Sequence, residues 1–214
     1  MAHSPSFQRA RSAEAKEERS AALLTAARWL AADKGVRAVT LTEIATAAGV
    51  HVSGVRRYFG SREEIFLRLA ADEWAAWTEE VRHGLQTRDD LPALLSETLA
   101  GRGLFCDLLA HVPLTLEREV PAGPVREYKL AALAAVDVFV AAVTSATALS
   151  ERDAVDLVAA VTALAGNLWQ ISHPPQTLIR LYAEDARVAH AASDFTPRLT
   201  RLVAALVEGL ARAS

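Results

Sequence analysis

The segment from Thr40 to Glu64 reads TLTEIATAAGVHVSGVRRYFGSREE, and it decides the fold of the N-terminal part of the chain. It predicts two short helices joined by a tight turn at Gly49, with a third helix opening at Ser61. The second helix, from Val52 to about Phe59, carries basic side chains on its exposed side. Two short helices joined at a steep angle, the second one basic, are typical of a protein that reads the DNA major groove.

Local signals mark where these helices begin. Thr40 starts a Thr-x-x-Glu capping box and Ser61 a Ser-x-x-Glu box, in which hydroxyl and carboxylate accept the first free backbone N–H groups. Residues 13–34 have apolar side chains at helical spacing and predict one helix that ends at Gly35. Residues 1–12 lack this period, so we expect them to be loose.

The composition bounds the class of protein. The chain has 214 residues, 51% of them hydrophobic, with only 10 Gly and 8 Pro. This length suffices for one large or two modest domains with cores, and the many Ala and Leu residues favour an all-α fold. Cys106 is the single cysteine, which excludes an intramolecular disulfide. The N-terminus is polar and no run approaches the roughly 20 apolar residues of a membrane span, so we expect a soluble cytoplasmic protein without a membrane partner.

Charge is divided unevenly along the chain. Residues 1–62 hold 10 Lys/Arg and 5 Asp/Glu, a balance of +5, whereas residues 63–214 hold 13 and 21, a balance of −8. The two parts together give the net charge of −3. This asymmetry indicates a basic module that meets phosphate and an acidic body that does not.

The chain is predicted to have three parts. Residues 1–60 form a three-helix helix-turn-helix DNA-binding domain, residues 61–84 a connecting helix, and residues 85–214 a larger C-terminal helical domain. A turn-rich stretch near residues 86–90 marks the boundary on the sequence side. Further helices are expected over 91–100, 104–117 with a bend at Pro113, 125–146, 151–170 and from Thr196 onward.

An ordered set of residues runs through the first third of the chain. It consists of Leu23-Leu24, Ala26-Ala27, Gly35, Thr40, Ile44-Ala45, Ala48-Gly49-Val50, Tyr58-Phe59 and Ser61-Arg62-Glu63. This set resembles the pattern of the TetR-type transcriptional repressors, and the resemblance covers about residues 20–66, under a third of the chain. It implies a DNA-binding head on a larger helical body that dimerises and holds a small ligand.

Three positions depart from that family pattern. The second helix opens with His51 where the family usually has Ser, and His is a poorer N-cap. A family hydroxyl is replaced by Gly54, which lowers helix propensity by about 1 kcal/mol relative to Ala. The usual Tyr is Arg56. Two phosphate-contacting hydroxyls are therefore missing, and one of them is replaced by a guanidinium.

DNA contacts are predicted on the second helix and beside it. We expect Arg56 or Arg57 either to read guanine through its O6 and N7 atoms or to clamp a phosphate. Tyr58 and Arg62 occupy positions that resemble phosphate contacts of the family, although Tyr58 could instead only pack beneath the module. The complete predicted set is Thr40, His51, Val52, Ser53, Gly54, Arg56, Arg57, Tyr58 and Arg62.

A homodimer is expected because one short helix reads too few base pairs for useful specificity, whereas two heads read a palindromic operator. The helix over 151–170 is apolar on two sides, and the last helix carries a leucine stripe. Together they would form a four-helix interface with a second copy, unless both helices only complete a monomer core. The residues predicted at this interface are Val155, Val158, Thr162, Leu199, Leu202, Val203, Leu206 and Leu210.

The region 91–146 is predicted to hold a small effector in a mostly apolar cavity between bent helices. The same side chains could equally be ordinary core. The residues expected to line the cavity are Phe105, Leu109, Tyr128, Phe139, Asn167 and Trp169. No cofactor or metal is expected, because Cys106 is alone and the six His residues are scattered without ligand spacing.

These observations predict a ligand-responsive DNA-binding regulator, most simply a homodimeric repressor released by its effector. One alternative is a DNA-binding scaffold or nucleoid-type protein without an effector. A second is a helical enzyme in which Asp107 and His111, one helical turn apart, act as an acid–base pair. The sequence shows no phosphate-binding glycine loop, nucleophile elbow or zinc-protease motif, so no enzymatic activity is predicted.

Overall fold

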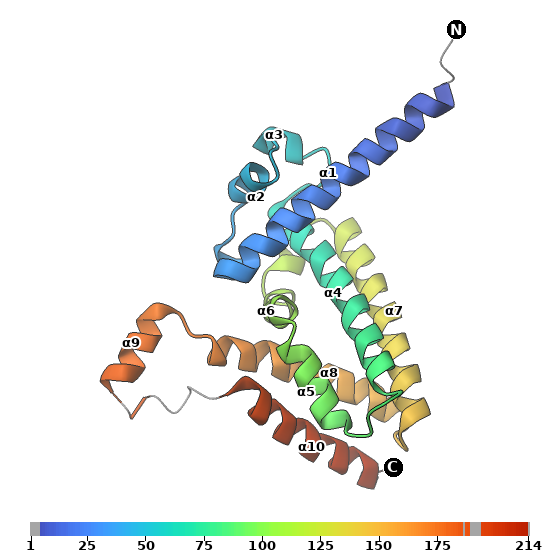
Figure 1. Ribbon diagram of the computed structural model, residues 1–214, viewed down its shortest axis with the longest axis vertical. Coiled ribbons are helices and arrows are strands. Elements are labelled where there is room, and N and C mark those ends of the chain that lie inside the picture. Colours follow the sequence, from blue (N-terminus) through green and yellow to red (C-terminus); the bar gives the residue numbers. More distant parts are fainter. Residues whose placement is uncertain (1–4, 186, 189–193, 214) are drawn as a thin grey trace.

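The computed structural model describes residues 5–185, 187–188 and 194–213, with side chains from residue 14 to residue 212. Within these ranges every regular element is a helix, so the prediction of an all-α fold is confirmed. Figure 1 shows a small N-terminal head above a larger helical body, with α4 (Arg62–Gly84) running from one into the other.

The head consists of α1 (Pro5–Lys34), η1 (Val36–Ala38), α2 (Leu41–Ala47) and α3 (Val52–Val55). The helix α1 begins eight residues before the predicted start at residue 13, so the expectation of a loose segment from residue 5 onward is wrong. Proline suits a first helical position, and no glycine or proline follows it before the helix ends. The head has its own apolar core, whose buried side chains include Leu23, Ala27, Ile44, Ala45, Val55 and Phe59.

The body contains the remaining helices. The predicted helix over 104–117 ends at His111 and resumes only as a 3-10 turn, because Pro113 has no N–H to continue the helical hydrogen bonds. The predicted helix from residue 125 begins at Ala122, since Pro124 is tolerated in a first turn. The elements are α5 (Leu91–Ala100), α6 (Gly103–His111), η2 (Leu116–Arg118), α7 (Ala122–Ala146), α8 (Glu151–Ser172), α9 (Gln176–Glu184) and α10 (Phe195–Ala213).

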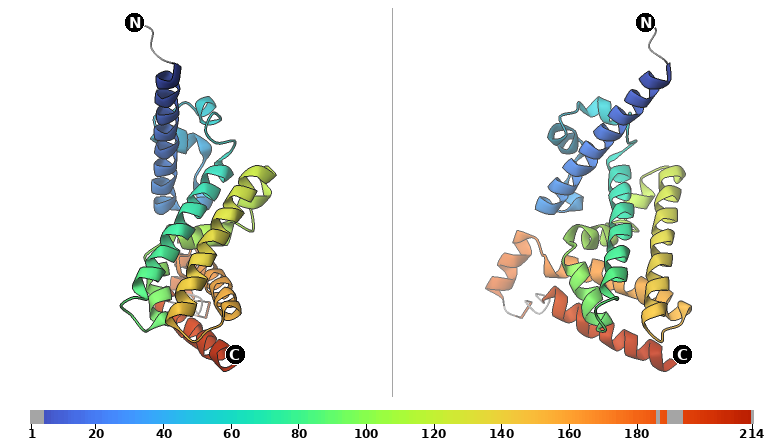
Figure 2. Two further views of the ribbon diagram at one scale, coloured as in Figure 1. Left: turned by 90° about the vertical axis from the view of Figure 1, so that its right-hand side faces the viewer. Right: turned by 45° about the vertical axis from the view of Figure 1, so that its right-hand side comes forward.

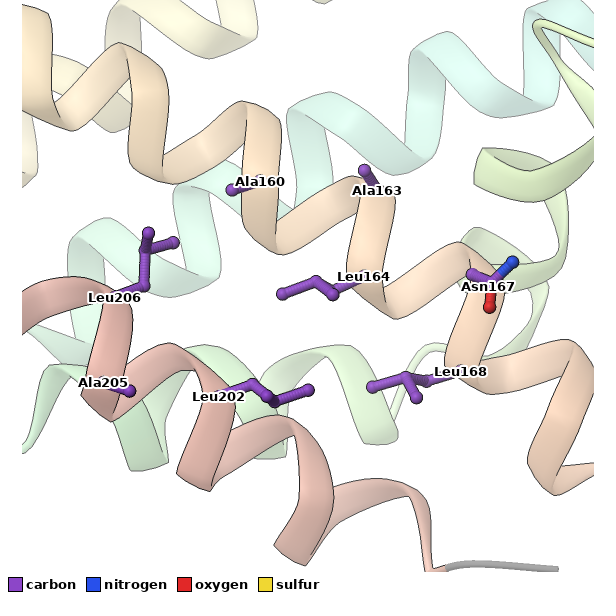
Figure 3. A pocket seen from close by; sticks show the side chains of 8 residues that line it. All are labelled: Ala160, Ala163, Leu164, Asn167, Leu168, Leu202, Ala205 and Leu206. Atoms are coloured by element: carbon purple, nitrogen blue, oxygen red, sulfur yellow. The ribbon is translucent and has the colours of Figure 1, made fainter. Parts of the chain in front are cut away.

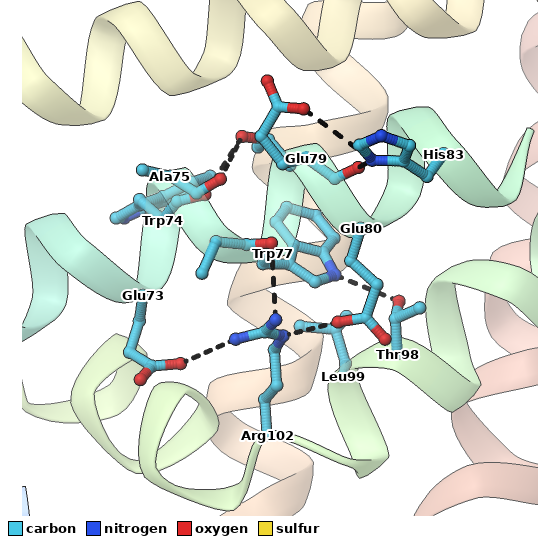
Figure 4. A network of polar contacts seen from close by, with 12 residues as sticks. Glu73, Trp74, Ala75, Trp77, Glu79, Glu80, His83, Thr98, Leu99 and Arg102 are labelled. Atoms are coloured by element: carbon cyan, nitrogen blue, oxygen red, sulfur yellow. Dashed lines mark hydrogen bonds and ion pairs between the residues drawn. The ribbon is translucent and has the colours of Figure 1, made fainter.

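Aromatic side chains fill the centre of the body. The helices α4 and α7 lie side by side (Figures 1 and 2), and Trp77 of α4 stacks on Phe139 of α7 with ring centroids 5.5 Å apart. Trp74 meets Phe105 of α6 edge to face at 5.3 Å. The Trp77 indole N–H donates to Thr98 Oγ1 at 3.1 Å, as drawn in Figure 4. The buried Trp77 indole therefore keeps its hydrogen bond, and the aromatic rings pack against one another between α4, α6 and α7.

Two body helices are longer and more apolar than the sequence analysis allowed. The helices α7 and α8 are long and apolar enough to cross a bilayer by length and composition, with mean hydropathies of 1.7 and 1.4. The expectation that no segment approaches that composition is therefore wrong. Charged residues interrupt each apolar run, but they are too few to bring the mean hydropathy of the helix below the level expected of a membrane span. Here both helices pack in the body, through Phe139 and Val143 on α7 and Leu157 and Val161 on α8.

Candidate DNA-binding interface and sites of the body

The α2–turn–α3 unit is held by the interactions that its sequence predicts. The Thr40 hydroxyl accepts from the Glu43 N–H at 3.3 Å, and the Glu43 carboxylate accepts from the Thr40 N–H at 2.8 Å, so the capping box is present. Gly49 has φ +65°, which a residue without Cβ adopts at no steric cost. Val50 then returns to α2 through its N–H, which donates to the Ala45 carbonyl at 2.9 Å.

The second helix is shorter than predicted. It ends at Val55 rather than near Phe59, and the N–H groups of Arg57 and Tyr58 bond three residues back, to the carbonyls of Gly54 and Val55. Gly54 is a weak helix former, and its place in the middle of so short a helix favours this tighter turn. Arg56 and Arg57 consequently lie in the turn that follows α3, with both side chains exposed.

His51 is a better cap than expected. Its side chain accepts from the Ser53 N–H at 3.3 Å, and its Nδ1 lies 2.8 Å from Ser53 Oγ. The expectation that His51 caps poorly is therefore corrected, because an imidazole nitrogen replaces the usual hydroxyl oxygen. Nδ1 accepts from a backbone N–H, so the ring presents its other edge outward from the start of α3.

Most of the predicted DNA-contacting residues lie together on the surface of the head. Five of them are exposed, and the other four, including Tyr58, are half-buried. Tyr58 also packs against the core, so one part of its ring is structural while the other remains accessible. The exposed residues are Thr40, His51, Ser53, Arg56 and Arg57, and the half-buried ones are Val52, Gly54, Tyr58 and Arg62.

Arg62 is the exception. Its guanidinium donates to the backbone carbonyls of Val36 and Val39 and, at 2.7 Å, to Glu63 Oε1, and it lies over the ring of Phe66. These donors connect the start of α4 to η1. The structure therefore gives Arg62 a role inside the head rather than the predicted phosphate contact.

The six residues predicted to line one ligand cavity do not surround a common space. Phe105 and Phe139 are fully buried in the aromatic core, and Tyr128 accepts from the Trp74 indole N–H at 3.3 Å. Asn167 instead faces the surface between α8 and α10, Trp169 lines a cleft next to the head, and Leu109 packs against the core. Phe105 and Phe139 pack against the tryptophans of α4, and the six residues share no pocket among those described, so an effector cavity lined by all of them stays a prediction.

The predicted dimer residues divide into two groups. Val158, Thr162, Leu199 and Val203 are buried within the single chain, so their assignment to an interface is wrong. Val155 and Leu202 are exposed, and Leu206 and Leu210 are partly so. Apolar periodicity identified two apolar helices, but it could not distinguish the face that α8 and α10 turn to each other from the face they leave open.

An apolar groove of about 660 Å³ lies between the open faces of α8 and α10. Figure 3 shows Leu164 of α8 facing Leu202 and Leu206 of α10 across it. Two short side chains of α8, Ala160 and Ala163, also line the groove. These two alanines were not singled out in the sequence, where they are indistinguishable from the other alanines of the helix.

Two buried carboxylates join the head to the body. Glu73 of α4 pairs with Arg28 of α1 and, at 3.1 Å, with Arg102, which also reaches Glu80 at 2.8 Å (Figure 4). Asp107 of α6 accepts from the Val36 N–H of the head at 2.6 Å. Arg28 and Arg102 lie between the buried Glu73 carboxylate and solvent and balance its charge, so ion pairs help to hold the junction.

Asp107 also meets two side chains of the body. Its Oδ1 accepts from Gln170 Nε2 at 2.7 Å and lies 3.2 Å from His111 Nδ1. Burial acts to raise the pKa of Asp107, but the hydrogen bonds from His111, Val36 and Gln170 hold it below its usual value. The hydrogen bond to Asp107 raises the pKa of His111 against the opposing effect of burial. Of these three donors only Val36 belongs to the head, so Asp107 connects the head to the body while His111 and Gln170 hold its carboxylate in place.

Cys106 and the histidines that the structure describes form no metal or redox site. Burial raises the pKa of the Cys106 thiol to about 12, and its Sγ donates to the Leu99 carbonyl at 3.3 Å. Among the side chains that the structure describes, no three His, Cys, Asp or Glu residues gather as a metal site would require.

The head with its exposed basic turn and the separate helical body define a DNA-binding transcription regulator of the helix-turn-helix class. Residues 23–69 match the family model of bacterial regulatory proteins of the tetR family, and residues 71–213 match that of the tetracyclin repressor-like C-terminal domain. The chain therefore belongs to the TetR family of transcription regulators, a family of regulators rather than enzymes.

Solved structures of similar fold include regulators of lipid and alkane metabolism. FadR of Bacillus halodurans is 14% identical, with 88% of this chain and 98% of that one covered and a TM-score of 0.57. FadR of Thermus thermophilus, in complex with lauroyl-CoA, is 21% identical over 89% and 94% of the two chains, with a TM-score of 0.56. AlkX of a Dietzia strain is 17% identical over 90% and 95%, with a TM-score of 0.53. Comparison with curated protein sequences gave no match.

Proposed function

We propose that the protein is a homodimeric repressor that binds a palindromic operator through α2, α3 and the turn after them, and that a small effector releases it. The observation that carries this proposal is the open apolar groove of α8 and α10. The helices α8 and α10 that form it lie towards the end of the molecule opposite α2 and α3 (Figure 1), so a partner bound there leaves both heads free for DNA.

The groove has the chemistry of an interface with a second copy. Leu164, Leu202 and Leu206 present apolar surface to solvent, and Ala160 and Ala163 let another helix approach closely. Contiguous exposed apolar surface on a soluble protein marks an interaction site. Two α8–α10 pairs related by a two-fold axis form a four-helix interface, in which each groove receives the same helices from the partner.

Operator binding rests on the exposed residues of the head. Arg56 and Arg57 are adjacent in the turn after α3, and His51 and Ser53 lie at the start of α3. The head of one subunit reads only a few base pairs, and a dimer doubles the site with the symmetry of a palindrome. A regulator that acts on DNA in this way works in the cytoplasm, where we expect this protein to be.

The effector is proposed to be a small, mostly apolar molecule. Solved structures of the same fold include complexes with lauroyl-CoA and with resorcinol, which supports a body able to carry a ligand. Binding that favours one separation of the two heads would shift the dimer away from the spacing that fits the operator. The helix α4 belongs to both head and body, so it transmits that shift.

Sedimentation velocity tests the dimer. The wild-type protein is expected to have a mass in solution twice the 23.0 kDa of one chain. The Leu202→Glu variant is expected to be a monomer, and its circular dichroism spectrum should match that of the wild type. Leu133→Glu on α7 is the matched control, because Leu133 is an exposed leucine outside the groove. A monomeric wild type, or a Leu202→Glu protein that stays dimeric, contradicts the proposal.

A DNA-binding scaffold without an effector is the alternative. Adding effector-class molecules to the protein–DNA complex separates the two functions. A repressor loses affinity for its operator in the presence of its effector, whereas a scaffold binds DNA equally with and without it.

A further inference from the structure

A second hollow lies between the head and the body, and we call it the head–body cleft. It has a volume of about 1200 Å³. One wall comes from the end of α1 and from η1, and the other comes from α6, the end of α8 and the segment before α9. A molecule bound in the cleft would therefore contact both parts of the protein at once.

The acids at the junction are already paired. Glu73 is held between Arg28 and Arg102, and Asp107 accepts from a backbone N–H, an amide and an imidazole. A carboxylate with this many donors offers little attraction to a cationic ligand. Asp33, on the rim of the cleft, is exposed to water and its charge is screened.

Most cations of the cleft are already paired. Of the four Lys or Arg side chains that line it, Arg28 and Arg102 pair with Glu73, Arg102 also pairs with Glu80, and Lys34 pairs with Glu43. In the described part of the chain Arg37 has no salt bridge, and it lies close enough to His111 to oppose the rise in the pKa of that imidazole. His173 adds a second imidazole, stacked on Trp169 at 3.7 Å between ring centroids.

Apolar surface adjoins these cations. Ala31 and Ala32 line the cleft from the head, and Leu104 and Trp169 line it from the body. Trp169 packs directly on the backbone of Gly103, where an added Cβ would lie 2.5 Å from the indole ring. Because Gly103 has no side chain, the Trp169 ring can lie against its backbone and form one wall of the cleft. The cleft therefore combines an anion-attracting part with an apolar part, as ligand sites do.

We propose that the head–body cleft binds an organic anion, a carboxylate or a phosphate ester carried on a small apolar body. Its charged group lies against Arg37 of the head, and its apolar part lies on Leu104 and Trp169 of the body. Because these contacts belong to different parts, such a ligand binds most tightly at one separation of head and body. This inference rests on the proposed function, for which it supplies the effector site and effector class.

Fluorine NMR of the full-length protein containing 5-fluorotryptophan tests the site without DNA. The chain has four tryptophans, and Trp169→Phe identifies the signal of the cleft. Benzoate and phenyl phosphate are the anionic probes, and benzamide is the neutral control of the same shape as benzoate. Fragments of this size are expected to bind with a Kd on the order of 10 mM.

The proposal predicts a saturable shift of the Trp169 signal with at least one of the anions and none with benzamide, while the signal of buried Trp77 stays in place. The probe that binds more tightly decides between carboxylate and phosphate. Arg37→Gln is expected to weaken binding about fivefold, the effect of losing one partly exposed charge-assisted hydrogen bond. Arg126→Gln, which removes an exposed arginine of α7, is expected to leave it unchanged.

Three results would overturn the proposal: no saturable shift with either anion, an equal shift with benzamide, or unchanged affinity in Arg37→Gln. None of them depends on an operator. Failure to bind DNA would therefore count against the proposed function and leave the cleft to be judged by these titrations alone.

Discussion

Replacing Asp107 should reveal how strongly the head is fixed to the body. Asp107→Ala removes the acceptor of the Val36 N–H, which is buried, and leaves that donor without a partner. An unsatisfied buried donor costs about 1–3 kcal/mol, and loss of a hydrogen bond to a charged group costs a similar amount. Gln170 and His111 can turn toward water and add less. We expect Asp107→Ala to lower the free energy of unfolding by about 2–4 kcal/mol.

Asp107→Asn provides the control because an amide keeps the shape and one oxygen. That oxygen can still accept from the Val36 N–H, and the amide group of Gln170 can rotate to present its own oxygen to the new NH₂. Only the charge and its share of the His111 contact are lost, so we expect a cost of about 1 kcal/mol.

Urea unfolding at pH 6, followed by circular dichroism at one protein concentration, measures both variants. The reasoning is refuted if Asp107→Ala is as stable as the wild type within about 0.5 kcal/mol, or if Asn costs as much as Ala.

Two further predictions concern the same junction. Gly103→Ala should lower the free energy of unfolding by about 1–3 kcal/mol, because its Cβ would press into the Trp169 ring; a fully stable variant in urea would contradict this packing. The raised pKa of His111 means that its contribution to stability is fully present below the unfolded value of about 6.5 and is lost as pH rises through the folded pKa. The difference in the free energy of unfolding between wild type and His111→Gln should therefore shrink as the pH rises from about 6 to 8. A difference that grows over this range would contradict a stabilising ion pair between His111 and Asp107.

The head could be predicted from the sequence because its signals are local. The capping box at Thr40 and the left-handed turn at Gly49 each act within a few residues, and the structure shows both. The length of α3 was overestimated, because apolar spacing between Val55 and Phe59 suits a helix and a tight turn alike. Local stereochemistry fixes such elements, whereas their last turn depends on a balance of small propensities.

The sites of the body were predicted less well, because periodicity does not say what covers a face. Val158 and Leu202 belong to equally apolar stripes, yet one is buried in the chain and the other is open. Phe105 and Phe139 suggested a cavity, but they interlock with the tryptophans of α4. The sequence suggested only that Asp107 pairs with His111 on the same helix. Its contact with the Val36 N–H could not be predicted, because the two residues are 71 positions apart.

Binding of the purified protein to its own upstream DNA tests the central claim most directly. Fluorescence anisotropy with a labelled duplex should give an affinity that falls steeply with salt, with a log–log slope of about −5 for a dimer touching roughly six phosphates. Arg56→Ala combined with Arg57→Ala should weaken binding by at least about tenfold, the cost of losing one good base or phosphate contact per head. Unchanged affinity of the double variant at moderate salt would contradict the account.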